Sequence, residues 1–162
     1  MTFPDTKETR MDWKLEVVVV PVSDIDRAKR FYADQIGFSV DHDTKVSDEV
    51  RVAQLTPPGS ACSIVLGKGI VEMAPGSLKG LQLVVSDIHA ARAHLIARGV
   101  EASEVQVFDS GSFRPSREGD ALDNVAFVYF SDPDGNAWAV QQISHRDSVW
   151  NPHFRRARLE PH

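Results

Sequence analysis

Two stretches of this chain repeat one another, and the repeat constrains the fold more than any other feature. Residues 17–38 read VVVVPVSDIDRAKRFYADQIGF, and residues 81–100 read LQLVVSDIHAARAHLIARGV. Each stretch runs from a β-branched strand through Val-Ser-Asp-Ile into apolar residues at helical spacing, and then reaches a glycine. The Val-Ser-Asp-Ile junctions lie about 63 residues apart. The sequence therefore predicts an internal duplication of one strand-and-helix module.

Further short strands are expected after the helix of each module, which gives the order β-α-β-β-β twice. Asp24 and Asp87 are expected to cap helices at residues 24–36 and 87–98. Runs rich in β-branched and aromatic residues predict the strands. The expected strands are residues 15–22, 38–42, 50–56, 61–66, 81–85, 104–108, 124–131 and 137–143.

A polar loop is expected at residues 109–123 of the second module, between two of its strands. It contains two glycines, a proline and one aromatic residue, Phe113. Two interpretations are open: the loop closes over a ligand site, or it is an ordinary solvated connection.

A tight turn is expected to close the second module. Asp132-Pro133-Asp134-Gly135 fits the four positions of a type I turn, in which proline presets φ and glycine adopts the left-handed conformation. The first module has a related turn at residues 55–66, LTPPGSACSIVL. Its second proline disfavours type I geometry, so we expect this hairpin to close differently.

Length, composition and charge narrow the class of protein. A chain of 162 residues, 42% hydrophobic, is long enough for one compact domain or for two small halves that share a core. The formal charge of -5 argues against a nucleic-acid partner. The single cysteine excludes an internal disulfide framework, and no apolar run is long enough for a membrane span. We therefore expect a soluble, cytoplasmic protein with no membrane partner.

The domain organisation follows from these patterns. We expect a polar N-terminal lead at residues 1–13, module 1 at 14–66, a linker at 67–80, module 2 at 81–143 and a C-terminal tail at 144–162. The tail is rich in arginine and contains Trp150 and Phe154. It is expected either to dock on an acidic surface of this chain or of a partner subunit, or to be disordered.

The doubled Val-Ser-Asp-Ile junction and the closing DPDGN turn resemble the vicinal oxygen chelate superfamily, which includes glyoxalase I, extradiol dioxygenases and bleomycin-resistance proteins. The resemblance covers residues 14–143. It implies an α+β fold in which two tandem βαβββ modules form a curved, cup-shaped mixed sheet with the ligand on its concave face. It also implies a homodimer, because members that sequester small molecules form their pockets between subunits.

The resemblance places the metal ligands of the family's enzymes at four strand positions, usually occupied by His or Glu. In this chain those positions hold Val17, Ser63, Gly80 and Ala139. None of these side chains offers the imidazole or carboxylate that such a site needs. We therefore expect no metal and no other cofactor.

Alternation along the strands predicts which side chains line the cup, if these four positions face into it. The resulting surface is mainly apolar, and its glutamines and serine supply hydrogen bonds. Alternatively, the cup is a collapsed core in which the glutamines bond one another. The expected ligand-contacting residues are Val17, Val19, Arg51, Ser63, Gln82, Val84, Phe113, Tyr129, Ala139 and Gln141.

Three functions remain open on these grounds. The leading interpretation is a glyoxalase-like protein without the usual metal ligands, which binds a small, mostly apolar organic molecule for sequestration or resistance. The alternative is a lyase, isomerase or dioxygenase-like enzyme that uses atypical metal ligands or metal-free acid-base catalysis. A third is an accessory domain that binds another protein.

Overall fold

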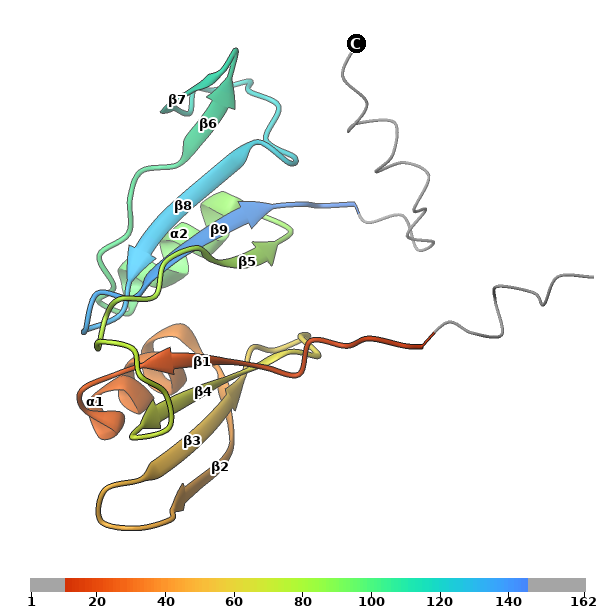
Figure 1. Cartoon of the computed structure of the whole chain (residues 1–162). Coiled ribbons are helices and arrows are strands. Elements are labelled where there is room, and N and C mark those ends of the chain that lie inside the picture. Colours follow the sequence, from red (N-terminus) through yellow and green to blue (C-terminus); the bar gives the residue numbers. More distant parts are fainter. Residues whose placement is uncertain (1–10, 146–162) are drawn as a thin grey trace, which may run out of the picture. The chain divides into compact units, whose positions relative to one another are not determined.

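The computed structural model of the protein describes residues 11–145 (Figure 1). A boundary after Ser77 divides the chain into two compact units, unit 1 before it and unit 2 after it. The boundary lies inside the connector expected at residues 67–80. Each unit contains one mixed sheet and one main helix, as a duplicated module requires.

Unit 1 contains a four-stranded sheet in the order β1-β4-β3-β2. Strand β1 is parallel to β4, and the remaining pairs are antiparallel. Its elements are β1 (Val17–Pro21), α1 (Ile25–Lys29), a π-helical continuation η1 (Arg30–Ile36), β2 (Ser39–Lys45), β3 (Arg51–Thr56) and β4 (Ser63–Lys68).

Unit 2 contains a five-stranded sheet in the order β5-β9-β8-β6-β7. Strand β5 is parallel to β9, as β1 is to β4, and the other pairs are antiparallel. Its elements are β5 (Leu81–Val85), α2 (Ile88–Ala97), β6 (Gln106–Asp109), β7 (Ser112–Pro115), β8 (Ala126–Ser131) and β9 (Ala137–Gln142).

Strand β7 was not expected, because it lies inside the segment predicted to be a polar loop. Two residues connect it to β6, Ser110 and Gly111, and both have positive φ, 53° and 89°. Two successive residues with positive φ form the type I′ turn that suits the twist of a tight hairpin. The prediction of a loop throughout residues 109–123 was therefore wrong, and Phe113 lies on a strand.

The repeated junction has the same local structure in both units. The side chain of Asp24 accepts a hydrogen bond from the backbone N–H of Arg27 at 3.0 Å, and Asp87 accepts one from Ala90 at 3.0 Å. Both predicted N-caps are therefore confirmed. The first helix ends at Gly37, whose φ of 102° suits glycine in particular.

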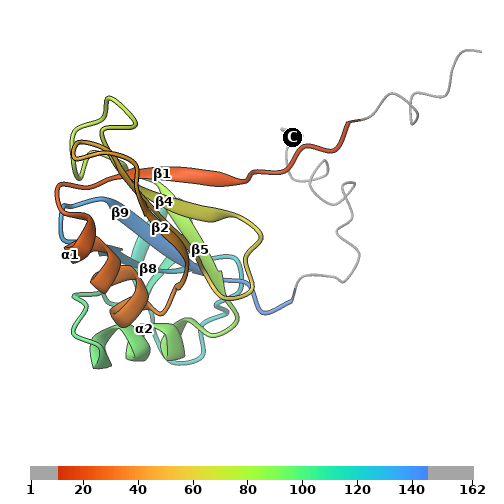
Figure 2. The same ribbon diagram turned by 90° about the horizontal axis from the view of Figure 1, so that it is seen from below.

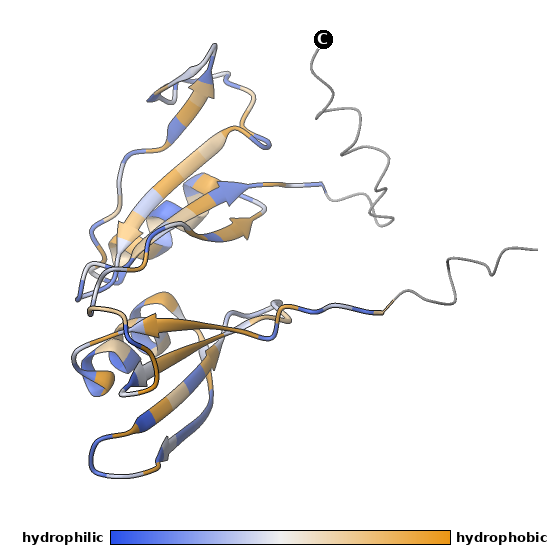
Figure 3. Cartoon of the chain, in the orientation of Figure 1, coloured by the Kyte–Doolittle hydropathy of each residue, from blue (hydrophilic) through white to orange (hydrophobic). Residues whose placement is uncertain are grey.

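Each helix covers one face of the sheet in its own unit (Figures 1 and 2). Helix α1 contacts β3 and β4, whereas α2 contacts β8 and β9. The apolar side chains on these faces are buried, among them Leu55, Leu66, Val128 and Trp138. We call the opposite face of each sheet its open face. The edge strand β2 is exposed throughout and largely hydrophilic (Figure 3).

The turn at residues 132–135 is confirmed, and its first aspartate organises it. One carboxylate oxygen of Asp132, Oδ1, accepts hydrogen bonds from the backbone N–H groups of Asp134, Gly135 and Asn136, each at 2.9 Å. The other oxygen accepts one from Asn136 Nδ2 at 2.7 Å. Asn136 is fully buried, and its Oδ1 accepts a hydrogen bond from Leu78 N–H at 3.1 Å. The turn is thereby joined to the chain that leads into β5.

The turn of the first module closes differently, as its second proline predicts. Ser60 N–H donates to the carbonyl of Pro57 at 3.0 Å, and Gly59 has a φ of 84°. Proline followed by glycine with positive φ at the two central positions is typical of a type II turn.

These elements form an α+β fold of two βαβββ-like modules, which is the predicted fold class. The curvature of the sheets into a cup stays a prediction. Within residues 11–145, no helix is long and apolar enough to span a membrane. Most of the expected N-terminal lead and C-terminal tail, including Trp150 and Phe154, lies outside the described residues.

Candidate functional site

The open face of unit 2 brings together most of the residues predicted for this module. In the sheet register, Gln82 lies beside Ala139, which in turn lies beside Tyr129. In the next row, Val84 lies beside Gln141. These side chains share one face because directly paired residues point the same way.

Four aromatic residues form an exposed cluster on this face, which we call the aromatic cluster: Phe108, Phe113, Phe127 and Tyr129. The ring of Phe113 lies 5.1 Å from that of Phe108, 5.7 Å from that of Phe127 and 6.3 Å from that of Tyr129. The rings of Phe127 and Tyr129 are nearly parallel, 7° apart, with centroids separated by 6.3 Å. Phe113 is 50% exposed, Phe108 45% and Tyr129 38%. Exposed rings that contact one another in this way are typical of a binding surface.

An ion-pair network supports β7, the strand that carries Phe113. The guanidinium of Arg114 donates to both carboxylate oxygens of Asp120, each at 2.9 Å, and its Nε donates to Asp109 at 3.1 Å. Hydrogen bonds from Arg114 are also the main reason that the pKa of Asp120 lies well below its usual range. A planar, bidentate pair of this kind holds both partners in one geometry.

Two glutamines form a hydrogen-bonded chain on the open face of unit 2. Gln141 Nε2 donates to the backbone carbonyl of Asn124 at 2.8 Å, and Gln82 Nε2 donates to Gln141 Oε1 at 2.6 Å. The glutamines therefore do bond one another, as the collapsed-core alternative predicts. However, Gln82 is exposed, and the rings beside it are too. This face is not a collapsed core.

The open face of unit 1 carries Val17, Val19 and Ser63, as predicted. Val17 lies beside Ser63 in the register, and Val19 lies beside Val65. Part of this face is covered by its own unit: Ile70 packs so closely over Gly67 that an added Cβ would lie 2.4 Å from its side chain. Ser63, at the other end of β4, is also buried. Unit 1 therefore offers less accessible surface at these positions than unit 2.

A polar chain that was missed in the sequence crosses the open face of unit 1. The Thr56 hydroxyl donates to the carboxylate of Asp41, and Thr56 Oγ1 lies 2.6 Å from Ser63 Oγ. Because a carboxylate only accepts, Thr56 has used its single hydrogen, so Ser63 must donate to Thr56. Ser63 can therefore only accept a further hydrogen bond. Gln54 extends this chain, since its Nε2 donates to Asp41 at 3.5 Å and its Oε1 lies 3.2 Å from His42 Nε2.

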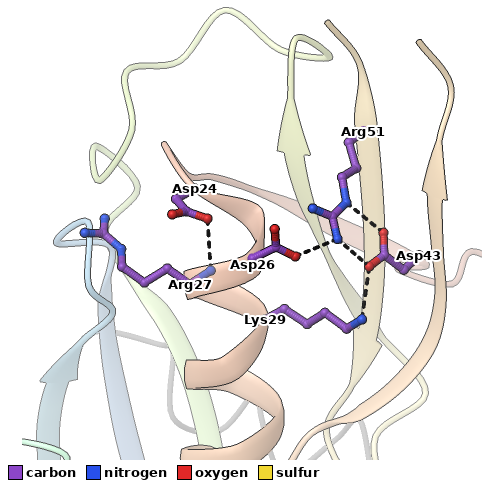
Figure 4. Close-up of polar contacts among 6 residues, drawn as sticks. All are labelled: Asp24, Asp26, Arg27, Lys29, Asp43 and Arg51. Carbon is purple, nitrogen blue, oxygen red and sulfur yellow. Dashed lines mark hydrogen bonds and ion pairs between the residues drawn. The ribbon is translucent and has the colours of Figure 1, made fainter. Parts of the chain in front are cut away.

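Arg51 lies on the helix face of unit 1 and not with Ser63. In the register it precedes Ala53 and Leu55 at two-residue spacing, and both are fully buried. Figure 4 shows its guanidinium between two carboxylates, 2.8 Å from Asp26 and 2.7 Å from Asp43. The prediction that Arg51 lies with the other ligand-contacting residues is corrected here, because strand alternation turns the Arg51 side chain toward α1.

This ion-pair cluster shifts the titration of Asp43. Hydrogen bonds from Arg51, and secondarily from Lys29 at 3.0 Å, hold the pKa of Asp43 at about 2, against an ordinary value of 3.8. Because the folded pKa is the lower one, the resulting stability is fully present above about pH 4. It is lost as the pH falls toward 2.

Replacing Arg51 by methionine is therefore expected to remove part of the acid dependence of stability. We expect the wild type to lose about 1 kcal/mol more than the variant between pH 4 and pH 2, because solvent screens a pair near the surface. Urea unfolding at a series of pH values measures this difference. Lys68→Met is the matched control, since Lys68 lies beside Arg51 in the register. A control with the same loss of acid dependence would contradict the assignment to Arg51.

The hollows of the surface differ in chemistry. One of about 630 Å³ lies on the charged side of unit 1 and is lined by Asp26, Asp43, Lys45 and Arg51 among others. Such a lining suits water and ions better than an apolar molecule. A smaller one in unit 2, about 420 Å³, is lined in part by Tyr129, Ser131 and Ala137 of the open face. The smaller hollow therefore adjoins the aromatic cluster.

The residues at the four inherited metal positions do not fit a metal. Val17, Ser63, Gly80 and Ala139 supply between them one neutral hydroxyl, and Ser63 donates its hydrogen to Thr56. Across residues 11–145, no three His, Cys, Asp or Glu side chains gather in a way that could hold an ion.

Comparisons with known proteins agree with this architecture. The family model for the Glyoxalase/Bleomycin resistance protein/Dioxygenase superfamily matches residues 14–140. Comparison with the curated proteins finds no significant match.

Several solved structures are similar to this chain. TnmS3, an antibiotic binding protein from Streptomyces sp. CB03234, is 32% identical over 83% of this chain and 99% of its own, with a TM-score of 0.65. A glyoxalase/bleomycin resistance protein from the same strain is 33% identical over 80% of this chain and all of its own, with a TM-score of 0.61. A superfamily member from Sphaerobacter thermophilus DSM 20745 is 26% identical over 82% of this chain and 99% of its own, with a TM-score of 0.64. The chain belongs to the glyoxalase, bleomycin resistance and dioxygenase superfamily.

Proposed function

We propose that this protein binds a small, mostly apolar organic molecule and releases it unchanged, as a sequestering protein does. The observation that carries the proposal is the aromatic cluster of unit 2, whose rings contact one another and of which Phe108, Phe113 and Tyr129 are exposed. An apolar ligand would gain by covering these rings, since roughly 25 cal/mol is recovered for each Å² removed from water.

The chemistry of this face supports binding rather than catalysis. Along β5, β9 and β8 the open face carries apolar side chains, two glutamines and the Ser131 hydroxyl, and Tyr129 is its titratable group. Burial raises the pKa of Tyr129, so the phenol stays protonated near neutral pH and is not a ready base. The similarity to an antibiotic binding protein favours the same class of ligand.

The proposal includes a homodimer. Strands β1 and β5 each pair with a single neighbour among the described residues, β4 and β9 respectively. Each therefore presents one unpaired edge, and β1 is a run of valines followed by a proline. Light scattering coupled to gel filtration is expected to give twice the chain mass of 17.9 kDa. A value equal to one chain would contradict this part of the proposal.

Binding and conversion are separated by one experiment. The protein is incubated with excess chelator and titrated with 2-methoxynaphthalene, whose own fluorescence reports binding. We expect saturable binding and quantitative recovery of the unchanged compound by mass spectrometry. If supplying Fe, Mn, Ni or Zn instead of chelator leads to conversion of the compound, the lyase, isomerase or dioxygenase alternative would replace sequestration. If nothing binds, the proposal fails.

A further inference from the structure

We infer that the open face of unit 2 selects an aromatic compound bearing a hydrogen-bond donor, such as a phenol, and that Gln82 accepts that hydrogen bond. This inference rests on the proposed function and specifies its ligand class. The residues involved all lie in unit 2.

The orientation of the Gln82 amide follows from the hydrogen-bonded chain. A backbone carbonyl only accepts, so the Asn124 carbonyl requires the amide nitrogen of Gln141, which lies 2.8 Å away. The oxygen of Gln141 is thereby turned toward Gln82, whose Nε2 donates to it at 2.6 Å. The Oε1 of Gln82 consequently points away from Gln141. It has no hydrogen-bond partner within residues 11–145.

The strand register leaves room for a ring between this oxygen and the aromatic cluster. Gln82, Ala139 and Tyr129 lie side by side on β5, β9 and β8. Neighbouring strands are about 4.8 Å apart, so the backbones of Gln82 and Tyr129 are separated by about 10 Å. In this row the residue between them is Ala139, whose side chain is a methyl group. An aromatic ring placed over Ala139 reaches Tyr129 at one edge and Gln82 at the other.

The chemistry at the two ends of this space differs. The ring of Tyr129 lies nearly parallel to that of Phe127, and together they offer apolar contact. The Gln82 end offers an amide oxygen of fixed orientation. A phenol can donate to this oxygen and can also accept from the second hydrogen on Gln82 Nε2, whereas a methyl ether can only accept. An ether would therefore displace water from Oε1 without replacing the lost hydrogen bond.

The test compares two probes that differ only at this group, 2-naphthol and 2-methoxynaphthalene. The measured quantity is the ratio of their dissociation constants, from fluorescence titration of the wild type and the variants. Gln82 is exposed, and Gln82→Leu is expected to change this ratio by about 3- to 10-fold in favour of the ether. This change corresponds to the loss of one hydrogen bond to the phenol. Gln141→Leu is expected to shift it in the same direction by less, because the Gln82 amide is then free to rotate.

Gln106→Leu is the matched control. Gln106 lies on the same face of unit 2, next to Phe127 and away from the row that contains Gln82. We expect this variant to keep the wild-type ratio. A ratio unchanged by Gln82→Leu, or shifted as much by Gln106→Leu, would overturn the inference even though both probes bind. Failure of both probes to bind would instead overturn the proposed function itself.

Discussion

Replacing Asp132 by alanine is expected to lower the free energy of unfolding by about 3 kcal/mol or more, because several buried polar groups lose their partner at once. The carboxylate accepts three backbone N–H groups and the amide of Asn136, and the residue is only 5% exposed. Alanine offers no acceptor. Urea unfolding of the wild type and the variant at neutral pH measures the loss.

Two further variants make this result specific. Asp132→Asn keeps one oxygen for the three N–H groups but sets an amide nitrogen against that of Asn136, so an intermediate loss is expected. Asp48→Ala removes a carboxylate that is 99% exposed and is expected to change stability by less than about 0.5 kcal/mol. Equal stabilities of the alanine and asparagine variants at position 132 would contradict the role given to its oxygens.

Replacing Phe113 by alanine is expected to weaken binding of 2-methoxynaphthalene by about tenfold or more, since a large apolar contact is lost together with its favourable ring geometry. The ring of Phe113 contacts those of Phe108, Phe127 and Tyr129, and Phe113 is half exposed, so about half of its surface is available to a ligand. Stability should change little for the same reason. Fluorescence titration and thermal unfolding report the two effects separately.

Trp13→Ala is the control for this prediction. Trp13 is another exposed aromatic residue, 85% accessible, but it precedes β1 in unit 1 and is not part of the aromatic cluster. Its removal should leave the affinity unchanged. If both variants bind equally weakly, the probe recognises exposed aromatic residues in general and the cluster is not the site.

Much of the fold could be predicted because its signals are local. The caps at Asp24 and Asp87 bond to N–H groups three residues away, and the turn at Asp132 contains its own hydrogen-bonding partners. The type I′ turn at Ser110 and Gly111 is equally local, but β7 lies in a mostly polar segment, which predicted a loop there. In contrast, the π-helical geometry at residues 30–36 has no pattern in the sequence that we can identify.

The candidate site was only partly predictable, because membership of a face depends on strand alternation and register. Alternation places Gln82, Val84, Ala139 and Gln141 together, and the structure agrees. The same rule places Arg51 with Ala53 and Leu55 on the core side. The correct face of Arg51 could therefore have been predicted from the sequence.

The aromatic cluster depends on pairing between strands that are distant in the sequence. Phe127 could have been found from its two-residue spacing to Tyr129, but Phe108 and Phe113 join it only through β6 and β7. The contact of Thr56 with Asp41 likewise follows a shift of register between β2 and β3, which no local pattern predicts. Ligand binding by all these residues stays a prediction.

If the aromatic cluster binds a ligand as proposed, we expect the bidentate contact between Arg114 and Asp120 to lower the entropic cost of binding. Strand β7 is short and lies at the edge of its sheet, so it would be expected to move more than its neighbours. Arg114, which follows Phe113 within β7, attaches the strand to Asp120 in the following segment, so the backbone that carries Phe113 is held in place before any ligand arrives. Binding immobilises side chains, and each one that becomes ordered costs about 0.5–1.5 kcal/mol of binding free energy. A ligand that stacks on a side chain whose backbone is already held in place avoids part of this cost.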